Sequence, residues 1–178
     1  SRAVAGEWAT MTYTCDKQGV TRLYINGTKT AEGYLNIGLG ELCARDASGD
    51  VNIGRTTIWP DKAMDGTIGS VKVYDYILYP EEEVVTSTAG PAAYYTFDDG
   101  DLSDKSGNGY NAAQTGAEAA TFVDEAGRGK VLELNNSDGK GRNSGASGIS
   151  VPVDALKGKN AATILMDAYV YNYSAQNV

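Results

Sequence analysis

An acidic turn at residues 98–108 holds the side chains best suited to binding a metal ion. It supplies four aspartates, two serines and one asparagine, and its glycines allow backbone carbonyls to turn inward. Calcium prefers clustered carboxylate and carbonyl oxygens, so the turn predicts a structural calcium site with the ligands Asp98, Asp99, Asp104 and Asn108. The alternative is that Asp and Gly are present because they favour turns.

Aromatic side chains are the candidates for binding a sugar, because Tyr and Trp rings can stack on the apolar faces of sugar rings. Trp59 is the first candidate, since it stands beside Pro60 in a polar loop. A tyrosine at an alternating strand position can instead pack in the core or against a neighbouring strand. The predicted ligand-binding residues are Trp59, Tyr34, Tyr110 and Tyr173, whereas Trp8 is predicted to lie in the core.

The elements that must position these residues are short β-strands. Residues 67–76 alternate as a strand does, which places Ile68 on one face and Val71 and Val73 on the other. The pair Asn26-Gly27 separates two apolar runs and predicts a tight hairpin. Many such segments within 178 residues predict an all-β protein built as one antiparallel β-sandwich.

Residues 52–84 resemble the closing segment of laminin-G-like, concanavalin-A-type jelly-roll domains. In that family the segment runs "iG", a loop, "G-x-I-D-x-V-x-V-Y" and "L-x-x-E-E". This chain has Asn-Ile-Gly, a loop, Gly-Thr-Ile-Gly-Ser-Val-Lys-Val-Tyr and Leu-Tyr-Pro-Glu-Glu. The family's Trp-led strand and "LYVNG" resemble residues 8–15 and 23–27. The acid common after "G-x-I" is Gly69 here, which puts in doubt any metal or loop contact that this acid would make.

Residues 93–171 resemble the opening part of the same family. The motifs "Y-x-F-D" and "D-x-S-G-N-G" match residues 95–98 and 104–109, and "G-x-A-L-x-F" matches residues 129–134. The family's "Y-V-x-V-P" and "A-W-V" strands resemble residues 149–152 and 162–171, with Tyr in place of the usual Trp. The resemblance implies a structural calcium near the acidic turn, with Asp65 close to it.

The closing half of the family therefore comes first in this chain. Residues 1–85 match the closing half, residues 86–92 form a small-residue linker, and residues 93–178 match the opening half. We favour a single sandwich over residues 1–178 with permuted order, because the termini of such domains tend to lie close together. Two alternatives stay open: the chain straddles two tandem domains, or a neighbouring copy supplies the completing strands through exposed strand edges.

Several function classes are not expected. Jelly-roll glycanases place paired carboxylates on one strand, as in Glu-x-Asp-x-x-Glu, and no such run occurs. The chain has no histidine, which excludes His-based nucleophilic catalysis and His-liganded zinc. The net charge of -8 without a basic cluster argues against nucleic acid. No apolar run approaches the roughly 20 residues that insert in a membrane.

The resemblance implies an extracellular protein, secreted or on the cell surface. The predicted function is that of a non-catalytic accessory module for carbohydrate binding or adhesion. The alternative is a structural module that joins a neighbouring domain or an identical subunit. Cys15 and Cys43 lie on separate predicted strands and are either a disulfide or two buried thiols.

Overall fold

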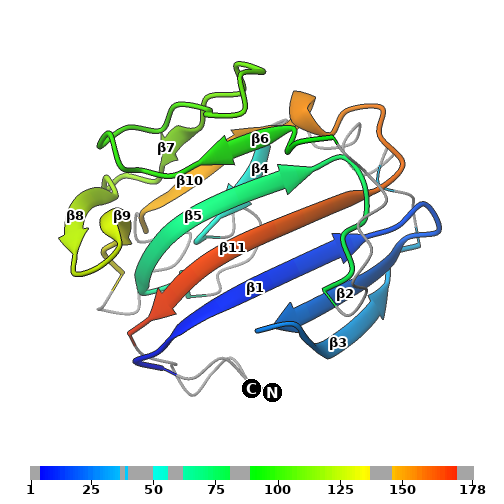
Figure 1. Cartoon of the computed structure of the whole chain (residues 1–178), viewed down its shortest axis with the longest axis horizontal. Helices are drawn as coiled ribbons and strands as arrows, with labels where there is room; N and C mark the ends of the chain where they lie inside the picture. Colours follow the sequence, from blue (N-terminus) through cyan, green and yellow to red (C-terminus); the bar gives the residue numbers. More distant parts are fainter. Residues whose placement is uncertain are drawn as a thin grey trace.

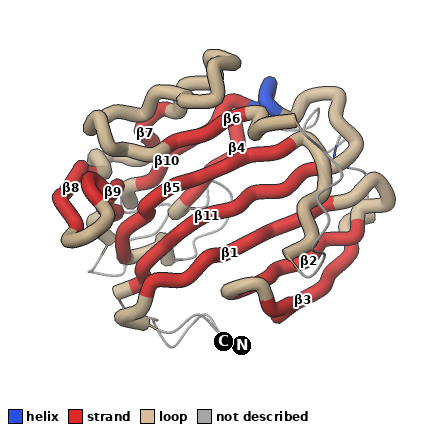
Figure 2. The backbone as a smooth tube through the Cα atoms, viewed as in Figure 1, coloured by secondary structure: helices blue, strands red, loops and turns tan. Residues whose placement is uncertain are grey.

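The computed structural model describes residues 5–36, 39, 50–55, 62–80, 89–136 and 146–171. Within these residues the chain forms two antiparallel sheets (Figures 1 and 2) and no helix long and apolar enough to cross a membrane. The elements are β1 (Trp8–Cys15), β2 (Val20–Ile25), β3 (Thr28–Tyr34), β4 (Asp50–Ile53), β5 (Gly66–Tyr74), β6 (Ala93–Tyr95), β7 (Ala113–Thr115), β8 (Thr121–Glu125), β9 (Gly129–Leu134), β10 (Gly148–Pro152), the 3-10 helix η2 (Val153–Ala155) and β11 (Ala162–Val170). This architecture confirms the all-β antiparallel sandwich.

The larger sheet mixes strands from both halves of the sequence. Its order is β3-β2-β1-β11-β5-β9-β8, with β6 also pairing with β5, and the smaller sheet has the order β4-β10-β7. In Figure 1, β11 runs between β1 and β5 in the middle of the larger sheet. The backbone N–H of Gly6 donates to the carbonyl of Val170 at 2.9 Å, so the two ends of the described chain meet. The permuted order and the proposed domain boundaries stay predictions.

The Asn26-Gly27 hairpin between β2 and β3 is confirmed. Both residues have positive φ, 48° for Asn26 and 79° for Gly27, which a two-residue turn between twisted strands requires. The turn brings Ile25 opposite Thr28. It therefore starts β3 at Thr28.

The strict alternation predicted for residues 67–76 is wrong at Gly69. The pairing of β5 with β11 shifts between Ala168, which faces Ile68, and Asp167, which faces Ser70, so Gly69 is an extra residue in a β-bulge. The bulge returns Val71 to the same face as Ile68, and both are fully buried. A bulge depends on the partner strand, so the alternation of β5 alone could not reveal it.

The core between the two sheets is also shared by both halves. Its largest fully buried side chains come from β5, β6, β9 and β10 and include Tyr95, Ile68, Leu132, Leu134, Ile149 and Val151, with Phe97 after β6. The Tyr95 hydroxyl donates to the carbonyl of Tyr110. Burial, and then the nearby Asp104 carboxylate, raise the pKa of Tyr95. Tyr95 therefore stays neutral and ties the core to the loop that carries Tyr110.

Charged side chains lie along the edge strand β3. Glu32 accepts from Arg22 Nε at 2.9 Å and pairs with Lys29 Nζ at 3.3 Å. The register of β2 and β3 also shifts between Leu23 and Tyr24. Charges and bulges at a sheet edge are common devices against pairing with another chain. This edge is therefore poorly suited to strand exchange.

Candidate functional site

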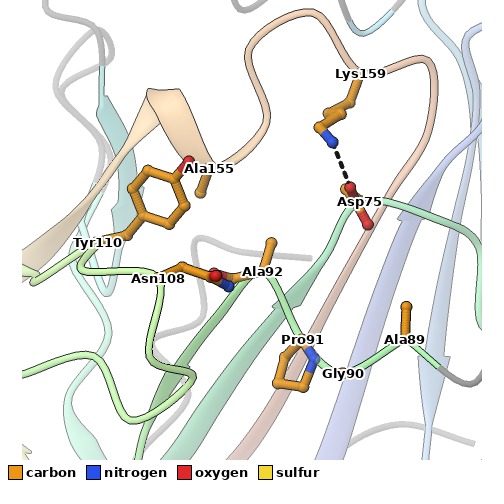
Figure 3. Close-up of a pocket in the computed structure, with 9 residues that line it drawn as sticks. All are labelled: Asp75, Ala89, Gly90, Pro91, Ala92, Asn108, Tyr110, Ala155 and Lys159. Carbon is orange, nitrogen blue, oxygen red and sulfur yellow. Dashed lines mark hydrogen bonds and ion pairs between the residues drawn. The ribbon is translucent and has the colours of Figure 1, made fainter.

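A pocket of about 270 Å³ opens at one end of the sandwich. Its described lining comprises the side chains of Asp75, Asn108, Tyr110 and Lys159, together with Ala155 and the segment 89–92 (Figure 3). The pocket brings together two residues that the sequence indicated separately, Asn108 and Tyr110. The other two functional side chains, Asp75 and Lys159, were not predicted.

Four chain segments meet at the pocket. Asp75 directly follows β5, and Lys159 lies in the turn after η2, where its N–H donates to the carbonyl of Leu156 at 3.0 Å. The segment 89–92 leads into β6 and is held at one end by the Tyr76 hydroxyl, which donates to the Ala89 carbonyl at 2.6 Å. The lining is thus anchored to the ends of central strands.

Asn108 and Tyr110 are fixed through their loop. The Asn108 side-chain amide donates to the Ala92 carbonyl at 3.0 Å, which links the loop to the segment before β6. The Tyr110 N–H donates to Asp104 at 3.0 Å, and its carbonyl accepts from the buried Tyr95 hydroxyl. The Tyr110 ring packs partly against the core and flanks the pocket (Figure 3). Its position is therefore set before any ligand arrives.

An ion pair crosses the pocket. Lys159 Nζ lies 2.6 Å from Asp75 Oδ2, and the side chains are partly exposed. The hydrogen bond that Lys159 donates to Asp75, and then the negative charge of Asp75, raise the pKa of Lys159. Lys159 therefore stays charged over the whole neutral range, and its charge is opposed by that of Asp75 within the pocket.

Asp104 organises the acidic turn. Its carboxylate accepts from the N–H groups of Tyr94, Ser106 and Tyr110 and from the Ser106 hydroxyl, at 2.8–3.0 Å. Partial burial alone would raise the pKa of Asp104, but the hydrogen bonds from these backbone N–H groups outweigh it, so the pKa lies below its ordinary value. The oxygens of Asp104 therefore already accept hydrogen bonds from donor groups of the protein.

A lysine occupies the centre of the remaining carboxylates. Lys105 Nζ lies 2.7 Å from Asp99 Oδ2, 2.6 Å from Ser103 Oγ and 3.5 Å from Asp101 Oδ1. An ammonium group therefore already lies against the carboxylates of Asp99 and Asp101. Among the described residues, no group of three or more Asp, Glu, Cys or His side chains is arranged to hold a metal ion. The donor set does not fit calcium as arranged, and a calcium site with Asp98, Asp99, Asp104 and Asn108 stays a prediction.

Asp104 makes the free energy of unfolding depend on pH in the acidic range. Because its folded pKa lies below the unfolded value of about 4, its contribution is present above that value and is lost as pH falls through the folded pKa. We expect Asp104→Asn to cost about 1 kcal/mol at pH 7, after allowance for solvent screening, because two acceptor positions become donors. Urea denaturation of both proteins at pH 7 and pH 2 should show the difference shrinking in acid. An unchanged difference would contradict the assignment.

Tyr34, Asp65 and Asp98 are not among the residues that line the pocket. Tyr34 is 67 % exposed at the end of β3. The Asp65 carbonyl accepts from the Tyr171 N–H at 3.0 Å at the opposite end of β5 from Asp75. Asp98 lies close to Gly129, where an added Cβ would come within 2.8 Å of its carboxylate. Trp59 and Tyr173 lie outside the described residues. Cys43 does too, so both alternatives for Cys43 and the buried Cys15, a disulfide or two thiols, stay open.

A second aromatic group lies on the face of the larger sheet that points away from the smaller one. Trp8 pairs with Tyr169 across the β1–β11 ladder, with ring centroids 5.7 Å apart, and the Arg128 guanidinium lies 3.8 Å from the Trp8 ring centroid. Arg128 also forms an ion pair with Asp167. The prediction of a core position for Trp8 is therefore wrong, because in β1 it is Ala9, 4 % exposed, that points inward.

Gly69 explains how Arg128 reaches Trp8 across two intervening strands. A Cβ at position 69 would lie 3.3 Å from the Trp8 ring, 3.2 Å from the Asp167 carboxylate and 3.6 Å from the Arg128 guanidinium. An acid at this position would therefore face these three groups. Nothing in the alternation of β5 signalled this contact, because Arg128 comes from the distant β8–β9 turn.

The comparisons with known proteins cover the first part of the chain. Residues 1–82 match the laminin G family model of the concanavalin A-like lectin/glucanases superfamily. No curated protein matches the chain. The matched segment runs from β1 to β5 and contains Asp75, whereas Asn108, Tyr110 and Lys159 lie beyond it.

Proposed function

We propose that this protein is a non-catalytic module that binds a saccharide in the pocket beside Tyr110, because residues 1–82 match a family model of the concanavalin A-like lectin/glucanases superfamily. It would act in carbohydrate binding or adhesion as part of a secreted or cell-surface protein. Saccharides present apolar C–H faces and a ring of hydroxyl groups. A site for them needs an aromatic wall and several fixed donors and acceptors.

The observation that carries the proposal is the composition of the pocket. Tyr110 supplies an aromatic ring, Asn108 an amide, and the Asp75–Lys159 pair both an acceptor and a donor. A small number of polar groups that point into a pocket with an aromatic wall is typical of sites that bind small molecules. The four side chains serve different parts of a polyol: the ring packs against C–H groups and the polar atoms bind hydroxyls.

The pocket is also ordered without a ligand. Tyr110 is held through both its backbone N–H and its carbonyl, and Asn108 through its side chain. Binding therefore has to immobilise few protein groups, which lowers the entropic cost of association. This is the property expected of a binding module that recognises one kind of ligand.

The proposal is tested by removing the ring. We expect Tyr110→Ala to weaken saccharide binding at least ten-fold, about 1.4 kcal/mol, because the stacking surface is lost while the polar groups remain. A glycan array identifies the ligand, and isothermal titration calorimetry measures its affinity for the wild-type protein and the variant.

Two control variants separate the loss of the ring from unfolding and from a general effect of removing a tyrosine. Tyr110→Phe keeps the ring and should retain most of the binding, which separates ring loss from unfolding. Tyr34→Ala removes an exposed tyrosine outside the pocket lining and should bind as the wild type does. A silent array, or binding that survives Tyr110→Ala unchanged, would refute the proposal.

A further inference from the structure

We infer that the pocket selects uncharged saccharides and that the Asp75–Lys159 ion pair excludes charged ones. The inference rests on the proposed function, since it names the class of ligand for the same site. It starts from the charges of the described lining. Asp75 and Lys159 are the charged side chains there, they carry opposite signs, and their nearest atoms lie 2.6 Å apart.

A negatively charged sugar finds no available cation in this lining. The carboxylate of a uronic acid would approach Lys159 where Asp75 already binds it. The ligand must then either displace the Asp75 carboxylate or lie beside it as a like charge. Both arrangements are unfavourable. A carboxylate is hydrated more strongly than a hydroxyl, and it would lose this hydration without gaining a cation that is not already paired.

A positively charged sugar likewise finds no unpaired carboxylate in the described lining. The amino group of a hexosamine would seek Asp75, whose carboxylate is held by Lys159. The turn next to the pocket offers no surplus charge either, since Lys157 and Asp154 flank Ala155 and pair at 3.7 Å. For acidic ligands the net charge of -8 of the whole chain adds a repulsion at longer range.

The neutral groups of the pocket suit hydroxyls. The Asn108 amide nitrogen is used on the Ala92 carbonyl, so its oxygen is the part that can accept from a ligand. The Tyr110 hydroxyl can both donate and accept. The hydroxyl groups of a saccharide can form hydrogen bonds with Asn108 and Tyr110. They can also bind the donor and acceptor positions of Lys159 and Asp75 that the ion pair does not use, so the pair need not separate.

The test changes the net charge of the lining with little change of shape. Asp75→Asn leaves Lys159 as an unpaired cation, so the variant should bind oligosaccharides of glucuronic acid at least ten-fold more tightly than the wild type does. The wild type should prefer the matched glucose oligosaccharides over the glucuronic acid series at least ten-fold. Titration calorimetry at low salt measures both, and the gain in the variant should fade with added sodium chloride as the cation is screened.

The matched control is Asp124→Asn, which removes a carboxylate from the Asp124–Lys130 ion pair between β8 and β9, outside the lining, and should change neither series. Thermal unfolding shows whether Asp75→Asn remains folded, as expected for loss of a partly exposed pair. Wild-type protein that binds glucuronic acid as tightly as glucose oligosaccharides would overturn the inference and leave the proposed function intact. An Asp75→Asn variant without the gain would also overturn it. A wild-type protein that binds no saccharide of an array refutes both.

Discussion

Replacing Asn136 with alanine is expected to lower the free energy of unfolding by about 3 kcal/mol. Asn136 is 1 % exposed and lies at the end of β9. Its amide nitrogen donates to the carbonyls of Met64 at 2.8 Å and Ser147 at 3.1 Å, and its oxygen accepts from the Ser147 N–H at 2.9 Å. Truncation leaves these buried backbone groups without their partner, and little water can reach them.

Equilibrium urea denaturation checks this value against two variants. Asn135→Ala changes the exposed neighbour and should have little effect. Asn136→Asp keeps the shape but places a carboxylate against two carbonyls, so at neutral pH it should destabilise at least as much as alanine does. A loss below about 1 kcal/mol for Asn136→Ala would mean that the backbone groups find other partners.

Gly66→Ala is expected to destabilise the protein by a similar amount, about 3 kcal/mol. Gly66 begins β5 and lies between β11 and β9 in the larger sheet. An added Cβ would lie 2.1 Å from the Tyr169 carbonyl oxygen and 3.0 Å from the Val170 Cα. Both neighbours are backbone atoms, so no side-chain rotation relieves the clash, and the two central strands must separate locally.

Gly90→Ala provides the matched control, because nothing lies within 4 Å of the Cβ it adds. Guanidinium denaturation is followed by tryptophan fluorescence, which includes the signal of Trp8 beside Tyr169 in the same ladder. Equal stability of the Gly66→Ala and Gly90→Ala variants would show that the spacing of β5 and β11 adapts freely.

The features that the sequence predicted well are those that obey local rules. The strand at residues 129–134 has the bounds that the resemblance to the family's "G-x-A-L-x-F" strand implied, and the Asn26-Gly27 turn has the positive φ angles that its residue types favour. The all-β sandwich follows from many such segments. The bulge at Gly69 depends on the pairing of β5 with β11, so the alternation of β5 alone gave the wrong face for Ile68.

The candidate site was predicted in part for the same reason. Tyr110 and Asn108 stood out by residue type within a short loop. Asp75 and Lys159 are 84 residues apart, one after a strand and the other after a turn, and neither differs in sequence from a solvated surface charge. In the acidic turn, by contrast, residue types alone suggested a site that the backbone geometry does not form as arranged. Its composition suggests a metal site, but the orientation of the backbone N–H groups towards Asp104 decides what its oxygens bind.

The lining of the pocket has a thermodynamic consequence for the whole molecule. Asp75 comes from the first half of the chain, and Asn108, Tyr110 and Lys159 from the second. Occupancy is therefore coupled to the docking of the halves on each other: any state in which β5 parts from β11 also loses its affinity. A saccharide present at a hundred times its dissociation constant would bias that equilibrium towards the closed sandwich by about 2.7 kcal/mol.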